Sequence, residues 1–300
     1  MNQFIKRIIK FITILIFFGL LALLSLNLLV NTNYKIKSDK STIFIGDSHI
    51  ENAINDSIIP HSKNMGSNSE FFYFSYYKLK QLLKDNPTIK QVYLCFSFHS
   101  LSSYYDDAVI SGEYSPFIAS RYYFSFPIKE QIRLIYWNKN NLPFFIKTVI
   151  KTGIKQSLEN EFRPFIGSFS NNFNETNAID SIMDNRLLHI YYENDRLKSF
   201  SEINIHYFNE IIKLCKKEGV DFTVVNTPIN EYLLKKIPNK YKNKLNELVK
   251  TNQLNYIDLS NLELSDNCFF SDGDHVSSLG AEKTSLKLKE IIDKRTTIYK

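Results

Sequence analysis

The feature that most restricts this chain is a run of 20 uncharged, mostly apolar residues from Phe11 to Val30. As a helix, such a run would be about 30 Å long, which is the thickness of a bilayer's hydrocarbon core. A cleaved signal peptide is the alternative, but its apolar region is usually shorter and ends at a small-x-small cleavage site. Residues 26–30 offer no such site. We therefore expect an uncleaved membrane anchor.

The charges around this run do not decide its orientation, because three basic residues precede it and three follow it within ten residues. Large domains cross a membrane largely regardless of flanking charge. We expect residues 1–10 to be a short cytoplasmic N-terminus, residues 11–30 the span and residues 31–41 a linker. Residues 42–300 would then form a domain on the periplasmic or cell-surface side.

Charge and cysteine usage exclude several functional classes. Lysine and arginine exceed aspartate and glutamate by 37 − 31 = +6. Three of these cations lie in the first ten residues, which leaves 34 − 31 = +3 for the rest of the chain, so we expect no nucleic-acid partner. The cysteines Cys95, Cys215 and Cys268 are odd in number and far apart, which favours neither disulfides nor a metal site. No phosphate-loop, dinucleotide or zinc-helix motif is found, and we expect no metal and no cofactor.

After the linker, short apolar runs alternate with helical patterns, which predicts a parallel sheet covered by helices on both faces. Residues 102–200 break this alternation, are rich in aromatic side chains and read as a mainly helical insertion that would cap the carboxyl edge of the sheet. The expected strands are 42–45, a short one near Asn64 and Met65, 92–96, 222–225 and 256–259. The expected helices are 71–83, 202–217, 239–251 and 279–293.

Gly46, Asp47 and Ser48 directly follow the first expected strand. A serine hydroxyl is a weak nucleophile unless it is exposed, held rigid and paired with a base. A sharp turn at Gly46 would place Ser48 at a helix N-terminus, where free N–H groups can stabilise an oxyanion. Taken alone, a serine in this position is more often a helix cap than a nucleophile.

Asp272 and His275 lie three residues apart, just before the last expected helix. In a compact turn, the carboxylate would hold one ring nitrogen of the imidazole and leave the other facing Ser48, as in a serine–histidine–aspartate triad. Asp274 is a competing partner, although a residue adjacent to the histidine usually points elsewhere. A polar turn with a surface histidine is the alternative for this motif alone.

Together, Gly46-Asp47-Ser48 and Asp272-x-x-His275 resemble the SGNH (GDSL-type) hydrolase superfamily, in particular its membrane-anchored bacterial cell-envelope members. The resemblance covers residues 42–101 and 202–293 and omits the insertion. It implies an α/β fold, namely a flavodoxin-like three-layer α/β/α sandwich, in which Ser48, His275 and Asp272 are catalytic.

The oxyanion hole is less clearly marked. The resemblance implies the N–H groups of Ser48 and Gly66 as donors, the latter from Asn64-Met65-Gly66-Ser67. The family's third block normally supplies an asparagine, but the third strand here runs into Phe96-Ser97-Phe98-His99. Ser97 or His99 could donate instead, and His99 could equally be a structural residue.

The resemblance implies a membrane-tethered serine esterase or O-acyltransferase that acts on acyl esters, acetyl first, of cell-envelope polysaccharide. Its partners would be the acylated carbohydrate, the membrane through the N-terminal helix, and polysaccharide-assembly proteins. Two alternatives stay open. The altered third block suits an inactive glycan- or partner-binding protein, and the anchor with its apolar insertion suits a lipid esterase.

Overall fold

The structure is a computed structural model that describes residues 2–30, 34–106, 110, 112, 114–158, 167–171 and 177–298. Parts of the predicted linker and insertion lie outside these ranges. The chain divides into two compact units. Unit 1 consists of Met1–Asn33 and Ile110–Arg163, and unit 2 consists of Tyr34–Val109 and Pro164–Lys300.

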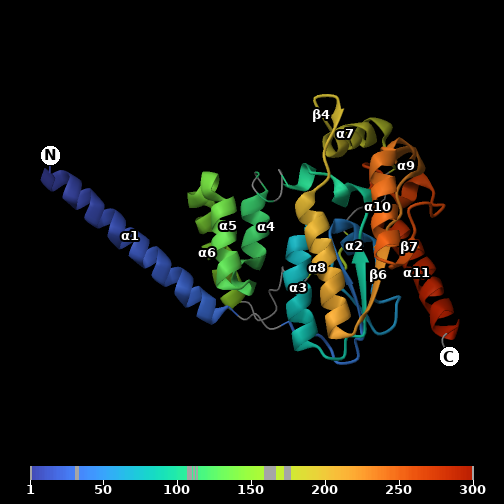
Figure 1. Cartoon of the computed structure of the whole chain (residues 1–300), viewed down its shortest axis with the longest axis horizontal. Coiled ribbons are helices and arrows are strands. Elements are labelled where there is room, and N and C mark those ends of the chain that lie inside the picture. The colour runs from blue at the N-terminus through green and yellow to red at the C-terminus, as the bar shows by residue number, and fades with distance from the viewer. Residues whose placement is uncertain are drawn as a thin grey trace. The chain divides into compact units, whose positions relative to one another are not determined.

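Unit 2 is built around one parallel sheet (Figure 1). Its strand order is β2-β1-β3-β6-β7. This is the flavodoxin-like order, so the predicted fold class is confirmed. The apolar runs that predicted each strand are buried in it. The strands are β1 (Thr42–Ile45), β2 (Ser62–Asn64), β3 (Gln91–Cys95), β6 (Asp221–Asn226) and β7 (Asn255–Asp258).

Helices cover both faces of this sheet. The chain moves one way from β1 to β2 and the opposite way from β2 to β3, so right-handed crossovers place the first two connecting helices on opposite faces. These are α2 (Ser48–Ala53), which packs against α11 (Ser278–Ile298), and α3 (Phe72–Asp85), which packs against α8 (Glu202–Glu218). Between β6 and β7 come α9 (Glu231–Lys236) and α10 (Asn239–Thr251).

The two faces of the sheet have separate apolar cores because successive strand residues point to opposite sides. On one face, Phe44 packs against Tyr93 with ring centroids 5.0 Å apart, in a buried cluster that includes Leu288 of α11. On the other, Phe96 packs against Phe208 of α8 at 4.6 Å. Each face of the sheet is thus packed against helices, which makes this unit a three-layer sandwich.

The predicted insertion is mainly helical, as expected, but it is divided between the two units. Unit 1 holds α4 (Ser115–Tyr122), α5 (Ile128–Trp137) and α6 (Leu142–Leu158). Unit 2 holds α7 (Asp180–Tyr191) and a hairpin of β4 (Tyr192–Glu193) and β5 (Arg196–Leu197). Short 3-10 turns are η1 (Phe98–Leu101), η3 (Tyr123–Ser125), η4 (Lys139–Asn141) and η5 (Asp266–Cys268).

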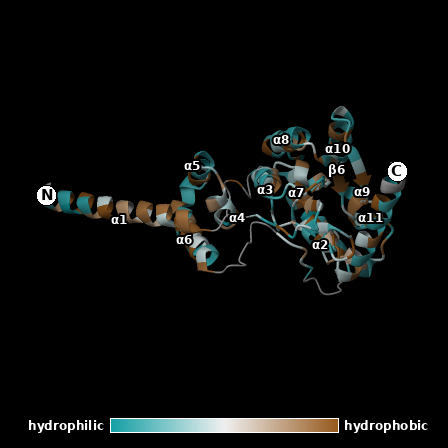
Figure 2. Ribbon diagram, turned by 90° about the horizontal axis from the view of Figure 1, so that it is seen from below, coloured by the Kyte–Doolittle hydropathy of each residue, from teal (hydrophilic) through white to brown (hydrophobic). Residues whose placement is uncertain are grey.

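The N-terminal run forms one long helix, α1 (Asn2–Leu29). Among the described residues it is the one helix long and apolar enough to span a membrane, with a mean hydropathy of 2.5 in an 18-residue window within Gln3–Leu29. Figure 2 shows apolar residues recurring along its length. Length and composition suit a transmembrane span or a signal sequence equally, so the predicted orientation stays a prediction.

Candidate active site

Ser48 is placed by a turn that requires glycine. Gly46 follows β1 with φ of 140°, and a Cβ built there would lie 2.7 Å from the Cβ of Cys95. The chain can therefore turn at once from β1 into α2, whose first residue is Ser48. Asp47 is the N-cap and accepts the His49 N–H at 3.0 Å. Ser48 stays half-buried at the carboxyl end of the strand, where a ligand can reach it.

His275 is placed by a tight loop between η5 and α11. Gly273 adopts φ of 65°, and the Oδ1 of Asp272 accepts the N–H groups of Asp274 and His275, each at 3.1 Å. A backbone bridge between Phe269 and Val276 closes the base of the loop. The carboxylate is thus held by the same turn that carries the imidazole, as the three-residue spacing predicts.

These two segments meet. Ser48 Oγ lies 2.8 Å from His275 Nε2, and His275 Nδ1 lies 2.7 Å from Asp272 Oδ2, although Ser48 and His275 are 227 residues apart in sequence. With Asp272 accepting the Nδ1 proton, Nε2 is left to accept the serine proton. The structure therefore brings together the three residues that the sequence analysis selected.

Asp272 is held ionised. Burial alone would raise the pKa of its carboxyl group, but the hydrogen bond and charge of His275, together with the Arg186 guanidinium, lower that pKa to about 2. A permanently charged carboxylate fixes the orientation of the imidazole and would stabilise the imidazolium formed when Nε2 accepts a proton.

Arg186 of α7 joins this site from the insertion. Its Nε lies 2.6 Å from Asp274 Oδ2 and 3.8 Å from Asp272 Oδ2, so one guanidinium serves both carboxylates of the loop. Burial opposes ionisation of Asp274, yet Arg186 and then His49 lower its pKa well below the usual value. As expected for the residue next to the histidine, Asp274 does not orient His275.

Beneath the triad lies a second set of buried groups. His99 Nε2 lies 2.6 Å from Asp47 Oδ2, and the His49 ring stacks on His99 at 4.1 Å and lies 4.7 Å from His275. His49 Nε2 lies 3.4 Å from Asp274 Oδ2. Burial lowers the pKa of His49, which favours a neutral ring beside the triad. These contacts connect the start of α2 with both flanking loops.

His49, His99 and Asp274 also form a cluster whose potential ligand atoms lie within 4.8 Å of one another. Two observations favour an ion-pair network over a metal site. The two imidazole rings are stacked and tilted by only 29°, whereas metal ligands converge on one point. Asp274 already binds the Arg186 cation, and His99 Nε2 is bound to Asp47.

The oxyanion donors are only partly placed as expected. The Gly66 N–H donates to the Asn64 side chain at 2.7 Å, so it is not free to receive an oxyanion in this structure. Asn64 is itself fixed, because its amide donates to the carbonyls of Ile50 and Ile54. An oxyanion would have to compete with Asn64 for this donor.

The two candidates from the third block are engaged elsewhere. Ser97 is fully buried with its Oγ 3.5 Å from Thr227, and the His99 ring is bound to Asp47. These contacts favour the structural interpretation of His99. The Ser48 N–H at the start of α2 stays the predicted oxyanion donor.

Four residues of the site lay outside the sequence-based triad: Asp47, His49, Asp274 and Arg186. An aspartate before a helix start is a typical N-cap, so Asp47 carried a readable signal. Arg186 carried none, because its segment matches neither family block.

A pH prediction follows from Asp47. Burial would raise the pKa of Asp47, but His99 and His49 lower it from 3.8 to about 2, which corresponds to roughly 2 kcal/mol of stability. Because the folded pKa is the lower one, this contribution is complete above about pH 4 and is lost as the pH falls towards 2.

We expect Asp47→Asn to lower the free energy of unfolding at pH 7, and we expect the gap in this free energy between variant and wild type to narrow below pH 4. Urea unfolding in detergent measures this gap. The exposed Asp39→Asn is the control, and a gap independent of pH would contradict the prediction.

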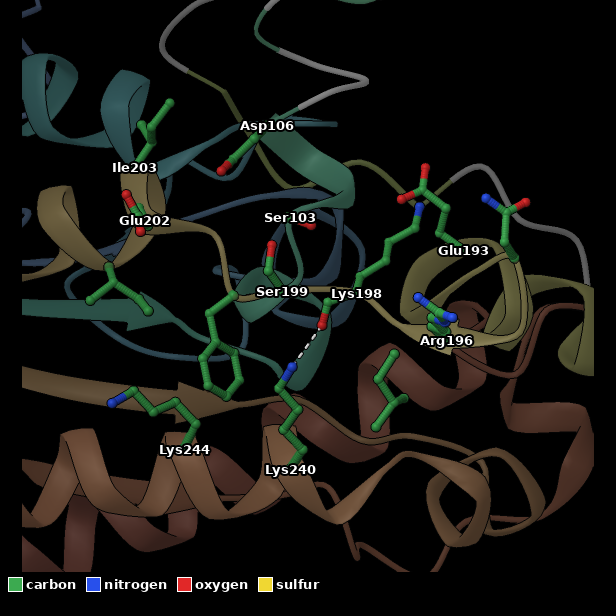
Figure 3. Close-up of a pocket in the computed structure, with 14 residues that line it drawn as sticks. Ser103, Asp106, Glu193, Arg196, Lys198, Ser199, Glu202, Ile203, Lys240 and Lys244 are labelled. Atoms are coloured by element: carbon green, nitrogen blue, oxygen red, sulfur yellow. Dashed lines mark hydrogen bonds between the residues drawn. The ribbon is translucent and has the colours of Figure 1, made fainter.

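A pocket of about 1260 Å³ in unit 2 is lined by the β4–β5 hairpin, the start of α8 and the exposed side of α10 (Figure 3). No triad residue lines it. Its one aromatic ring, Phe200, is approached by Lys240 at 4.8 Å and Lys244 at 5.9 Å, which leaves little of the ring for a sugar. It is therefore not the reaction site.

Comparisons with known proteins add little sequence information. No family model and no curated protein matches this chain. A proposed acylhydrolase from Bacteroides fragilis is 12% identical, with a TM-score of 0.38, and the match covers 87% of this chain and 89% of that one. A GDSL-like lipase from Bacteroides thetaiotaomicron is 10% identical, with a TM-score of 0.39, covering 87% and 92%.

Likeness at these TM-scores decides nothing by itself. The strand order and the site are more informative. The chain has an SGNH hydrolase-like α/β fold, with the serine directly after β1 and the Asp-x-x-His segment directly before the last helix.

Proposed function

We propose that this chain is a membrane-tethered serine esterase or O-acyltransferase. The observation that carries the proposal is the continuous hydrogen-bonded chain from Ser48 Oγ through His275 to Asp272, at 2.8 and 2.7 Å. An aligned nucleophile, base and orienting carboxylate constitute the machinery for acyl transfer.

In the first half of the reaction, His275 Nε2 takes the Ser48 proton while Ser48 Oγ attacks an ester carbonyl. The Ser48 N–H stabilises the oxyanion of the tetrahedral intermediate. His275 then returns the proton to the departing alcohol, which leaves an acyl group on Ser48. Asp272 stays ionised and stabilises the imidazolium throughout.

In the second half, a hydroxyl group removes the acyl group with His275 again as base. Water gives hydrolysis, and a sugar hydroxyl gives O-acyl transfer. Both outcomes use the same residues, so the acceptor distinguishes an esterase from a transferase. The departure of the third block from the family pattern favours transfer over hydrolysis as a working hypothesis.

For the substrate, we propose acyl esters of cell-envelope polysaccharide, acetyl esters first, with the catalytic unit on the outer side of the membrane. The support is the long apolar helix α1 ahead of unit 2 and the resemblance to anchored envelope members of the SGNH superfamily. Polysaccharide-assembly proteins are the proposed partners.

A lipid esterase is the second candidate, and one observation favours it. The apolar insertion helices pack against the end of α1, which would keep the protein close to acyl lipids. Acetylated sugars and glycerol esters presented side by side would separate the two candidates by relative turnover.

The central prediction concerns Ser48. We expect a fluorophosphonate probe to label the full-length protein in detergent, and Ser48→Ala to abolish labelling, because the probe reacts only with an activated serine. The exposed Ser57→Ala is the matched control and should label as the wild type does. Mass spectrometry of the modified peptide identifies the site. A folded wild-type protein that stays unlabelled would overturn the enzymatic proposal and favour a binding protein.

A further inference from the structure

Helix α6 packs onto the carboxyl-terminal end of α1, and α4 packs onto α6. Leu23, Leu26 and Val30 of the N-terminal run are buried within unit 1, whereas most of the earlier residues of α1 are exposed. The side-chain amide of Gln131 in α5 donates to Asn27 at 2.9 Å. Gly153 of α6 allows close approach, since a Cβ there would lie 3.2 Å from Leu26 Cδ1. If α1 crosses a bilayer, these contacts hold the three helices at its surface.

The outward face of α6 alternates cations with apolar side chains. Lys147, Lys151 and Lys155 recur every four residues and form one exposed stripe. Beside them, Ile154 is 46% and Leu158 is 76% exposed. The buried face is made of other residues, including Phe145 and Val149, so this outward face is not needed for packing within unit 1.

The outward face of α5 has the same character. Ile128, Ile132 and Tyr136 also recur every four residues and are 73%, 61% and 63% exposed. Phe117 of α4 adds an aromatic ring that is 51% exposed and packs edge-on to Phe144 of α6 at 5.2 Å. This small helical unit therefore exposes several large apolar side chains to solvent. Such exposure indicates an interaction surface.

The charge of the segment that forms α4–α6 identifies the partner. Residues 114–158 carry seven cations against one acid, Glu130, which is paired with Arg133 at 2.8 Å. A basic helical surface with interleaved aliphatic and aromatic side chains is typical of helices that lie in the interface of an anionic membrane. The cations are Arg121, Lys129, Arg133, Lys139, Lys147, Lys151 and Lys155.

We propose that α4–α6 lie on the surface of the same bilayer that α1 crosses, with their exposed apolar side chains among the headgroups and upper acyl chains. Lysine stems extend along the apolar region while their ammonium groups reach anionic phosphates. The proposal goes beyond the catalytic function and requires only that α1 inserts. Packing on α1 favours lipid over a protein partner, because α5 and α6 contact α1 at Asn27 and Leu26, near the carboxyl end of the expected span.

The sole tryptophan of the chain, Trp137 at the end of α5, reports on this contact. The full-length protein is reconstituted into phosphatidylcholine vesicles with and without phosphatidylglycerol, and flotation verifies insertion. We expect lipids brominated on the upper acyl chain to quench Trp137 emission at least twofold in anionic vesicles, and iodide to quench it weakly.

A charge variant separates lipid binding from passive proximity to α1. In anionic vesicles, Lys147→Gln/Lys151→Gln/Lys155→Gln should at least halve the quenching by brominated lipid and restore quenching by iodide. The control replaces three exposed lysines of unit 2, in the variant Lys216→Gln/Lys217→Gln/Lys250→Gln. It should change neither the quenching by brominated lipid nor the quenching by iodide. Strong quenching of Trp137 by iodide in the inserted wild type would overturn the proposal. Weak quenching by both iodide and brominated lipid would also overturn it and would indicate a protein partner. Failure of the protein to float with vesicles would also overturn it.

Discussion

Replacing His275 by alanine is expected to slow fluorophosphonate labelling of Ser48 by about 10³-fold or more, because the imidazole that hydrogen-bonds the hydroxyl is then lost. Ser48 Oγ is 2.8 Å from His275 Nε2, and the neighbouring His49 ring is stacked on His99 beneath the triad. The rate of fluorophosphonate labelling measures the effect directly and does not require the natural substrate.

The control for this variant is His206→Ala, which removes an exposed imidazole on α8 and should leave the labelling rate unchanged. Circular dichroism and thermal unfolding of both variants establish that the fold is intact. A folded His275→Ala protein that labels at the wild-type rate would show that another group activates Ser48, and would remove the triad from the mechanism.

The second large effect is expected from Arg186. In Arg186→Gln, Asp274 stays buried without its cation, which should cost roughly 3 kcal/mol of unfolding free energy. The variant should also slow fluorophosphonate labelling of Ser48 by about tenfold, because Arg186 contacts both carboxylates of the loop that carries His275, and a loosened loop displaces the imidazole from Ser48.

Asp274→Asn removes the buried carboxylate, so the double variant Arg186→Gln/Asp274→Asn should recover much of the stability that Arg186→Gln loses. Arg186→Lys keeps the charge and should lose less stability than Arg186→Gln. Urea unfolding in detergent measures these differences. A double variant as unstable as Arg186→Gln would contradict the role of Arg186 as the cation for Asp274.

Much of the fold could be predicted because its strands are short apolar runs with clear ends. Gly46 ends β1, and Thr227-Pro228 follows β6, so the alternation of strand and helix is visible in the residues themselves. The meeting of Ser48 with His275 follows from the same pattern, since segments that follow the carboxyl ends of parallel strands share one edge of the sheet.

What could not be predicted depends on side chains far apart in sequence. Nothing near Arg186 indicates that it binds the Asp272 loop, because helix α7 lies in a segment without a recognisable motif. The hydrogen bond from the Gly66 N–H to Asn64 likewise depends on the rotamer of the Asn64 side chain. The division of the insertion between two units was missed for another reason. The amphipathic patterns of α5 and α6 do not reveal that these helices contact α1.

The separation of 227 residues between the nucleophile and its base has a consequence for biosynthesis. Ser48 emerges from the ribosome soon after α1, but His275 is added 227 residues later. A growing chain therefore carries the hydroxyl without its base until the segment before α11 has been made. Under the proposed function, a product that stops short of this segment would lack the ability to cleave an ester, so truncated copies would be inactive.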